Sequence, residues 1–291
     1  MPKAQSAFCV LRTTFYATNG MRQDTNSWVE FDAGDYHIRA LAPFKRFRGL
    51  EIPWESISEL EDETEYVTKA TRSRIVVKLA AGQYGLPVEV YVKRYYLRTW
   101  LRVLLRSARK SRAREEFDLG WRLMGKNVRT PRPVWLAEGG GAAAPYSLLA
   151  TEALPEAESA VDRWLRCEDE AKRHEVLTAL GQFTARLHDV GFYHDDYKAQ
   201  HLLIFPDRPS VMQEFYLIDL LGGSFPPLLS RTGRARNLYQ MIRSFNPKHC
   251  SYGFTRAHRD AFLMAYAGSS LEAAEWSQWV KRAGRRKGRV L

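Results

Sequence analysis

Residues 187–203 read LHDVGFYHDDYKAQHLL, and residues 215–220 read FYLIDL. The first run predicts the end of a helix, a tight loop rich in His and Asp, and a short apolar strand. The second run predicts another apolar strand, which ends on a carboxylate. Two such strands would deliver Asp196 and Asp219 from adjacent loops. This arrangement suits phosphoryl transfer from a metal-bound nucleotide, with one carboxylate facing the attacking hydroxyl and the other holding the metal.

The spacing of polar residues in the first run is distinctive. His194, Asp196 and Lys198 alternate along the chain, and His201 follows. This pattern resembles the catalytic loop of the protein-kinase-like superfamily, which usually reads His-Arg-Asp with an Asn five residues after the Asp. Here Asp195 takes the position of the Arg and His201 that of the Asn. With the Leu-His-x-x-Gly-x-x-His lead-in, this variant is similar to the bacterial lipopolysaccharide core sugar kinases, the heptose and Kdo kinase family.

The resemblance implies an α+β, bilobal, protein-kinase-like fold. Residues 1–153 would form an N-terminal lobe of antiparallel strands plus one helix, with a hinge near 150–154. Residues 154–280 would form a mainly helical C-terminal lobe that carries the catalytic loop. Residues 281–291 would be a solvated basic tail.

The same resemblance implies which residues bind ATP. A hairpin predicted over residues 75–93 ends on Lys93, where the fold places a lysine that binds the nucleotide phosphates. By position on the next predicted helix, Glu116 would pair with this lysine, with Glu115 as the reserve choice. Backbone groups of Glu152 to Leu154, at the hinge, would meet the adenine.

Residues 68–74 would form the lid over the phosphates. This segment holds no glycine, unlike the Gly-rich loop of protein kinases. The hydroxyls of Thr71 and Ser73, with Arg72 and Arg74, would replace backbone N–H groups as phosphate contacts. A solvated basic turn is the alternative interpretation.

The catalytic roles follow from the loop register set by His194 and Lys198. Asp196 would orient the acceptor hydroxyl, and Lys198 would neutralise the transferring phosphoryl group. Asp219 would ligate Mg²⁺, which prefers hard oxygen ligands. A neutral imidazole is a poor magnesium ligand, so His201 would hydrogen-bond Asp196 or the phosphates, or favour Mn²⁺. The default for His194 and His188 is packing, with His194 bracing the loop.

The charge of the chain implies an acidic partner. The net charge is +11 and the pI is near 9.6. Residues 94–114 contain eight Arg and Lys and no acid, which predicts a helix facing an anion or a membrane surface. A phosphorylated glycolipid or sugar acceptor and the anionic membrane surface are therefore the expected partners. No specific nucleic acid is expected, because no nucleic-acid-binding motif accompanies the charge.

Composition also bounds the location. Three scattered cysteines, without a C-x-x-C pair, fit a reducing cytoplasm. We find neither a signal-peptide pattern in the first residues nor an apolar run long enough to span a bilayer. The expected location is the cytoplasm, with peripheral contact to the inner face of the cytoplasmic membrane.

The predicted function is therefore an ATP-dependent kinase of a sugar hydroxyl in a lipopolysaccharide core or related glycolipid. After Asp219 there is no Ala-Pro-Glu, the element that anchors the peptide-binding segment of protein kinases. The basic cluster of Arg231, Arg234 and Arg236 instead suits a phosphorylated sugar, because Arg binds phosphate bidentately. The alternatives are a protein or small-molecule kinase of the same fold, and a catalytically weak pseudokinase that scaffolds partners at the membrane.

Overall fold

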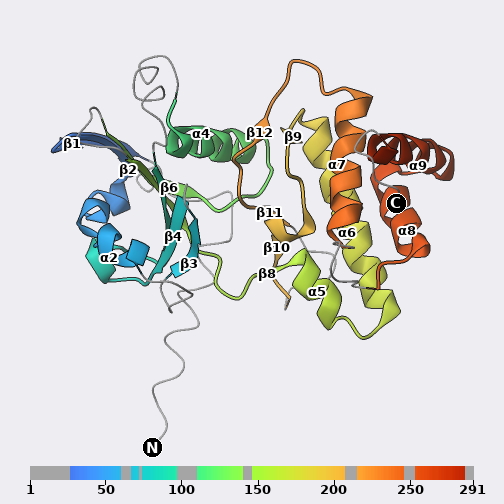
Figure 1. Ribbon diagram of the computed structural model, residues 1–291, viewed down its shortest axis with the longest axis horizontal. Helices are drawn as coiled ribbons and strands as arrows, with labels where there is room; N and C mark the ends of the chain where they lie inside the picture. Colours follow the sequence, from blue (N-terminus) through green and yellow to red (C-terminus); the bar gives the residue numbers. More distant parts are fainter. Residues whose placement is uncertain are drawn as a thin grey trace, which may run out of the picture.

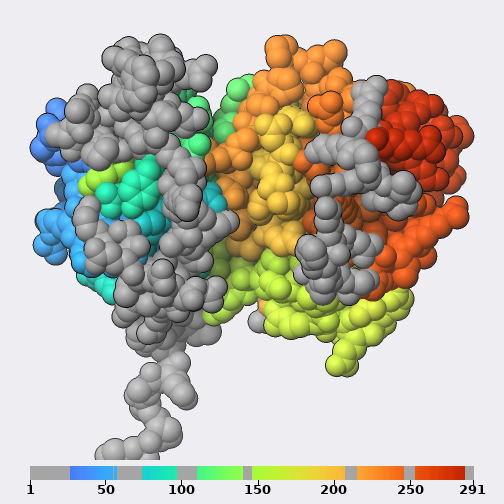
Figure 2. Space-filling model, viewed as in Figure 1, coloured from blue at the N-terminus to red at the C-terminus, as the bar shows by residue number. Residues whose placement is uncertain are grey.

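The computed structural model describes residues 27–59, 67–71, 74–96, 110–139, 146–206, 215–245 and 253–285. Two lobes lie side by side, one built on a β-sheet and the other mainly helical (Figure 1). The space-filling view shows the same division, with the sheet lobe in blue and green and the helical lobe in yellow to red (Figure 2). The fold is bilobal and kinase-like, as the sequence predicts.

The sheet lobe contains seven antiparallel strands in the order β1-β2-β6-β7-β5-β4-β3. Alternate residues of β4 face the lobe's core, where Ile75, Val77 and Leu79 are buried. The strands are β1 (Trp28–Ala33), β2 (Tyr36–Leu41), β3 (Val67–Thr71), β4 (Arg74–Leu79), β5 (Val90–Tyr96), β6 (Pro133–Gly139) and β7 (Tyr146–Glu152). Short helical segments follow β2: η2 (Ala42–Phe44), η3 (Gly49–Glu51) and α2 (Trp54–Glu59), and η4 (Gln83–Gly85) precedes β5.

Helix α4 (Arg112–Met124) packs on the face of the sheet opposite α2 (Figure 1). Its first turn is capped by Ser111, whose hydroxyl accepts a hydrogen bond from the backbone N–H of Arg114 at 3.0 Å. Phe117 and its neighbour Ala113 are buried against β5, β6 and β7. This apolar contact fixes the rotation of α4 about its own axis. The Glu116 side chain therefore points toward β5.

One prediction for this lobe is wrong. Strand β5 continues to Tyr96, so Arg94 is not part of an exposed cationic helix. Its side chain is buried, and its guanidinium lies 4.0 Å from the ring centroid of Tyr146 and 4.7 Å from that of Tyr96. Cation–π contact with aromatic rings lets the strand carry this charge inside. Residues 97–109, which hold half of the eight cations in that run, lie outside the described residues.

The helical lobe is built around α6 (Glu170–Asp189). Gly181 of α6 lies against α8, where an added Cβ would be 2.6 Å from the backbone oxygen of Phe262. The other helices are α5 (Ala160–Arg166), η6 (Ala199–His201), α7 (Arg231–Ser244), α8 (Arg256–Ala267) and α9 (Ser270–Arg285). Small strands complete the lobe: β8 (Glu158–Ser159), β9 (Tyr193–His194), β10 (Leu202–Ile204), β11 (Tyr216–Leu217) and β12 (Gly223–Ser224).

Two predicted boundaries differ from the structure. The residues after the hinge have a pattern that predicts one helix over 157–170, but Glu158 and Ser159 pair with β10, α5 spans only Ala160–Arg166, and α6 starts at Glu170. The hydroxyl of Ser159 accepts the backbone N–H of Asp162, so it caps α5 and sets its start. At the other end of the lobe, α9 runs to Arg285, so residues 281–285 are helical rather than the start of a tail. Ala283 is buried there, which holds this turn on the lobe.

The two lobes are bonded to each other along one margin. The backbone oxygen of Arg129 accepts the N–H of Leu217 at 3.0 Å, and the hydroxyl of Thr130 donates to the Leu217 oxygen at 2.8 Å. Arg129 also donates to the hydroxyl of Tyr216 at 3.1 Å. The segment between α4 and β6 is thereby tied to β11. Among the described helices, none has the length and apolarity that crossing a bilayer requires.

Candidate active site

A cavity of about 380 Å³ lies between the lobes. Its walls come from β4, β5 and α4 on one side and from the segments around η6 and β11 on the other. Seven of the residues singled out in the sequence line it: Arg74, Lys93, Glu116, Glu152, Leu154, His201 and Asp219. Residues far apart in the sequence therefore meet in one cleft, which is the arrangement that binding between two lobes requires.

Lys93 and Glu116 form an ion pair inside the cleft. The distance from Lys93 Nζ to Glu116 Oε1 is 2.5 Å, whereas the reserve candidate, Glu115, is exposed. Tyr95, which shares the face of β5 with Lys93, donates its hydroxyl to the other oxygen of Glu116. Burial and the adjacent Glu116 charge raise the pKa of Tyr95, which keeps this hydroxyl a donor. Glu116 is thus held from two sides and fixes the position of the lysine.

Asp219 is held by Arg74 from the other lobe. Arg74 Nη1 and Nη2 lie 2.6 and 3.2 Å from the two carboxylate oxygens, the bidentate geometry that favours Arg–carboxylate pairs. Burial disfavours the Asp219 carboxylate, but the hydrogen bonds and charge of Arg74 outweigh it and hold the pKa of Asp219 well below its usual range. Asp219 also has a positive φ of 55°, a left-handed conformation that Asp tolerates better than most residues. This bend aims its side chain back into the cleft.

The loop between β9 and η6 is ordered by two histidines. The N–H of Asp196 donates to His194 Nδ1 at 3.0 Å, so the proton of this neutral ring is on Nε2, which donates to the backbone oxygen of Asp219 at 2.8 Å. His194 therefore braces the loop, as its default assignment predicts, and joins the two aspartate segments.

His201 lies beside both aspartates. Its Nδ1 donates to the backbone oxygen of Asp196 at 3.1 Å, and its Nε2 is 3.9 Å from Asp219 Oδ2. Burial lowers the pKa of His201 despite the opposing Asp219 charge, so the ring is neutral at pH 7. A neutral imidazole in this position presents Nε2 without a proton toward the Asp219 carboxylate.

Asp196 and Lys198 lie outside the cavity lining, on the rim of the cleft. Their side chains are 55% and 44% exposed, and Lys198 Nζ donates to Asp196 Oδ2 at 2.7 Å. Exposure of this kind leaves the Asp196 carboxylate accessible to a large molecule, while the backbone contacts to His194 and His201 fix its position.

Asn237 on α7 holds the loop between β9 and η6, although no motif in the sequence indicates this role. Its amide donates to the backbone oxygen of His194 at 2.5 Å, and its Oδ1 accepts the backbone N–H of His194 at 3.2 Å. Oδ1 also accepts from Nε2 of His188 at 3.3 Å, so His188 Nδ1 accepts the hydroxyl of Tyr266 at 3.0 Å. Burial lowers the pKa of His188 to about 3, which keeps this ring neutral.

The hinge segment is anchored to the sheet lobe. The backbone N–H of Glu152 donates to the oxygen of Arg132 and that of Ala153 to the oxygen of Glu89, each at 2.9 Å. Burial raises the pKa of Glu152, and Arg132, with its Nη1 3.6 Å from Glu152 Oε1, opposes that rise. Leu154 is buried and adds apolar surface to the same end of the cleft.

Two predicted lid residues are not tested by the structure. Thr71 ends β3 and pairs with Arg74 in register, but its side chain lies outside the described part of the chain. Ser73 lies outside the described residues altogether. Within the described ranges, no group of three or more His, Cys, Asp and Glu side chains gathers as a metal cluster.

Comparison with known proteins gives two findings. The model of the lipopolysaccharide kinase (Kdo/WaaP) family matches residues 60–266. Among solved structures, the chain is similar to one described as WaaP in complex with acyl carrier protein, with 19% identity and a TM-score of 0.58 over 86% of this chain and 98% of that one. None of the curated proteins matches the sequence.

Proposed function

The chain belongs to the lipopolysaccharide kinase (Kdo/WaaP) family, and from this premise we propose that it transfers the γ-phosphoryl group of ATP to a sugar hydroxyl of a lipopolysaccharide core or related glycolipid. Members of this family are kinases, so the chain is a phosphotransferase. One observation carries the detailed proposal: Lys93, Glu116 and Asp219 converge on one interlobe cleft, with Asp196 at its rim.

In this proposal the nucleotide occupies the cleft. Lys93, positioned by Glu116, binds the phosphates, and the segment from Glu152 to Leu154 borders the adenine. Thr71 and Ser73, in the lid, contribute hydroxyls to the phosphates. The contacts that support this assignment are the 2.5 Å Lys93–Glu116 pair and the apolar Leu154 at the opposite end of the cavity.

The donor set of the cleft fits one divalent cation. Magnesium in kinases takes one or two protein carboxylates together with substrate phosphates, and Asp219 supplies such a carboxylate. Bound there, the cation would neutralise charge on the phosphates. His201 Nε2, neutral and 3.9 Å from the Asp219 carboxylate, is a softer donor that would suit Mn²⁺ better than Mg²⁺. Arg74 holds both oxygens of Asp219, so a cation that binds there would compete with this guanidinium for the carboxylate.

The acceptor is activated at the rim. Asp196 orients the sugar hydroxyl and accepts its proton, and Lys198, at 2.7 Å, stabilises negative charge on the phosphoryl group in transit. Positioning dominates this chemistry, which fits the number of backbone contacts that hold the loop.

The net charge of +11 supports partners that are acidic. A phosphorylated glycolipid at the inner face of the cytoplasmic membrane matches this charge and the family. An acyl carrier protein is a second partner that we propose for this chain, because the similar solved structure is described as a complex with one.

The test uses pure full-length protein, labelled ATP, Mg²⁺ and core glycolipid. We expect wild type to label the glycolipid, Asp196→Asn to lose at least about a hundredfold in rate, and Asp195→Asn to retain most of it. Asp195→Asn is the matched control because it also removes one negative charge from the same loop. Equal labelling by wild type and Asp196→Asn would refute the assignment of Asp196.

A further inference from the structure

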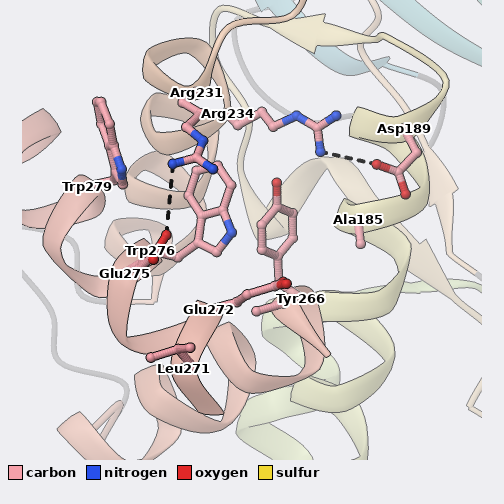
Figure 3. Close-up of a pocket in the computed structure, with 11 residues that line it drawn as sticks. Ala185, Asp189, Arg231, Arg234, Tyr266, Leu271, Glu272, Glu275, Trp276 and Trp279 are labelled. Atoms are coloured by element: carbon pink, nitrogen blue, oxygen red, sulfur yellow. Dashed lines mark hydrogen bonds and ion pairs between the residues drawn. The ribbon is translucent and has the colours of Figure 1, made fainter. Parts of the chain in front are cut away.

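A second cavity, of about 570 Å³, lies within the helical lobe. It opens between the last turns of α6, the first turn of α7, and α9 (Figure 3). Its volume exceeds that of the interlobe cleft and falls in the range typical of small-molecule sites. The residues of the proposed kinase site do not line it.

The walls of this cavity combine aromatic faces with paired charges. Tyr266 and Trp276 meet edge to face with their centroids 5.3 Å apart, and Trp279 borders the opening. Arg234 Nη1 lies 3.1 Å from Asp189 Oδ1, and Arg231 Nη1 lies 3.8 Å from Glu275 Oε2. Figure 3 shows the two arginines and Asp189 at the top of the view, the Tyr266 ring below them, and Glu272 beneath that ring. Each guanidinium therefore already has a carboxylate beside it.

This lining disfavours two classes of ligand. A fatty acyl chain would cover charged groups without replacing their hydrogen bonds to water, which is unfavourable. An anion would find both guanidiniums paired and three carboxylates around it, from Asp189, Glu272 and Glu275. A neutral polyhydroxylated ligand meets neither obstacle.

A sugar matches the lining in two ways. Each hydroxyl can donate to a carboxylate and accept from a guanidinium, so a paired Arg and acid together satisfy it. The C–H faces of a pyranose ring can pack on the rings of Trp276 and Trp279, which are partly exposed. We therefore propose that this cavity is a carbohydrate subsite that holds a sugar unit of the acceptor other than the unit that is phosphorylated. This inference rests on the function proposed above.

The cavity is close enough to the catalytic loop for one acceptor to reach both sites. Asp189, in its wall, precedes Asp196 by seven residues. A fully extended chain of that length spans at most about 25 Å, which bounds the separation of their Cα atoms. The wall is also bonded to the loop, because Tyr266 donates to His188 and His188 to Asn237, which holds His194. A bound sugar would thus be held on the same rigid frame as the acceptor hydroxyl.

The binding test uses lipid-free core oligosaccharide, titrated into full-length protein by calorimetry, with a free monosaccharide as a second ligand. The test variants are Glu272→Gln with Glu275→Gln, which keep side-chain shape, and Trp279→Ala, which removes an aromatic face. The control is Glu175→Gln, an exposed acid of α6 outside the cavity. We expect both test variants to weaken oligosaccharide binding about tenfold, with the control unchanged.

Kinetics separate this proposal from the kinase proposal. In the test variants the KM for a long oligosaccharide acceptor should rise about tenfold, while the KM for the shortest acceptor that is phosphorylated should not change. Equal binding by wild type and both variants, or no oligosaccharide binding at millimolar concentration, would overturn the subsite. If wild type binds the oligosaccharide as expected but phosphorylates no acceptor, the kinase proposal fails and the cavity is a carbohydrate site with another use. Binding of the monosaccharide alone would identify free sugar, not the glycolipid, as the ligand and would overturn the acceptor role.

Discussion

The guanidinium of Arg74 contacts both carboxylate oxygens of Asp219, at 2.6 and 3.2 Å, across 145 residues of sequence. The pair bridges the two lobes, and both residues line the cleft. A cation that binds Asp219 would therefore compete with the Arg74 side chain for the same two oxygens.

This competition predicts the behaviour of Arg74→Gln. Without nucleotide, the variant should bind Mn²⁺ at least about fivefold more tightly than wild type, because a charge-assisted hydrogen bond no longer has to be broken. Electron paramagnetic resonance of free Mn²⁺ measures this affinity directly. Lys78→Gln is the matched control, since Lys78 is on the same strand and pairs with Glu89 at 3.1 Å outside the cavity. Weaker Mn²⁺ binding by Arg74→Gln than by wild type would contradict the competition.

Asn237 positions the loop that carries Asp196 and does not line the cleft. Asn237→Ala leaves the buried backbone groups of His194 without their side-chain partner, so we expect a loss of about 2 kcal/mol in the free energy of unfolding. The kcat should fall while the KM for ATP stays nearly constant, because the proposed phosphate ligands lie on the other lobe. Asn237→Asp keeps the acceptor oxygen and loses the N–H donor. Its stability and its kcat should lie between those of wild type and Asn237→Ala. Urea denaturation and steady-state kinetics check both effects, and an unchanged kcat would rule out the positioning role.

His188 makes stability depend on pH. Its pKa is about 3 in the folded chain and near 6.5 when unfolded, so the unfolded state binds more protons between these values. Stability is therefore fully present above pH 6.5 and is lost as the pH falls toward 3. Between pH 7 and 5.5 this loss should be on the order of 1 kcal/mol.

The measurement is urea denaturation at pH 7 and pH 5.5 of wild type and His188→Gln. The variant should lose less stability on acidification, because it lacks the titrating ring. His174→Gln changes an exposed histidine on the same helix. This variant should lose as much stability between pH 7 and pH 5.5 as wild type does. A pH dependence identical in His188→Gln and wild type would exclude His188 as its source.

Gly181 allows α6 and α8 to approach each other closely. An added Cβ would be 2.6 Å from the backbone oxygen of Phe262 and 2.9 Å from the backbone nitrogen of Tyr266, so one helix must shift. Gly181→Ala should therefore destabilise the chain by about 1–3 kcal/mol, although alanine favours a helix. Gly125→Ala, where the nearest atom is 3.4 Å away, should change stability by less than about 0.5 kcal/mol. Equal stabilities of the two variants by chemical denaturation would argue against close packing at Gly181.

The sequence predicted the fold because the evidence for it is local. The loop around His194 and Asp196 has a fixed spacing, and strand alternation before Lys93 is visible in the residues themselves. Spacing along β5 could also have indicated Tyr95, which shares the face of Lys93. The pairing of Lys93 with Glu116 was predicted from position and is present in the structure.

Other features depend on tertiary contacts that leave no local signal. In the sequence, Arg94 is one more cation in a basic run. Its burial is explained only by the aromatic rings that surround it in the structure. Asn237 follows the catalytic loop by about 40 residues, and nothing near it in the sequence marks its contact with His194. The start of α5 was missed because the pairing of Glu158 and Ser159 with β10 outweighs the helical pattern there.

The bonds from Arg129 and Thr130 to Leu217 fasten the lobes along one margin of the cleft. In the proposed site, nucleotide would then enter where β4 carries Arg74 over Asp219. Because the ion pair between Arg74 and Asp219 joins the lobes there, we expect this pair to break when the cleft opens. The distance between α4 and β11 would stay constant throughout the cycle.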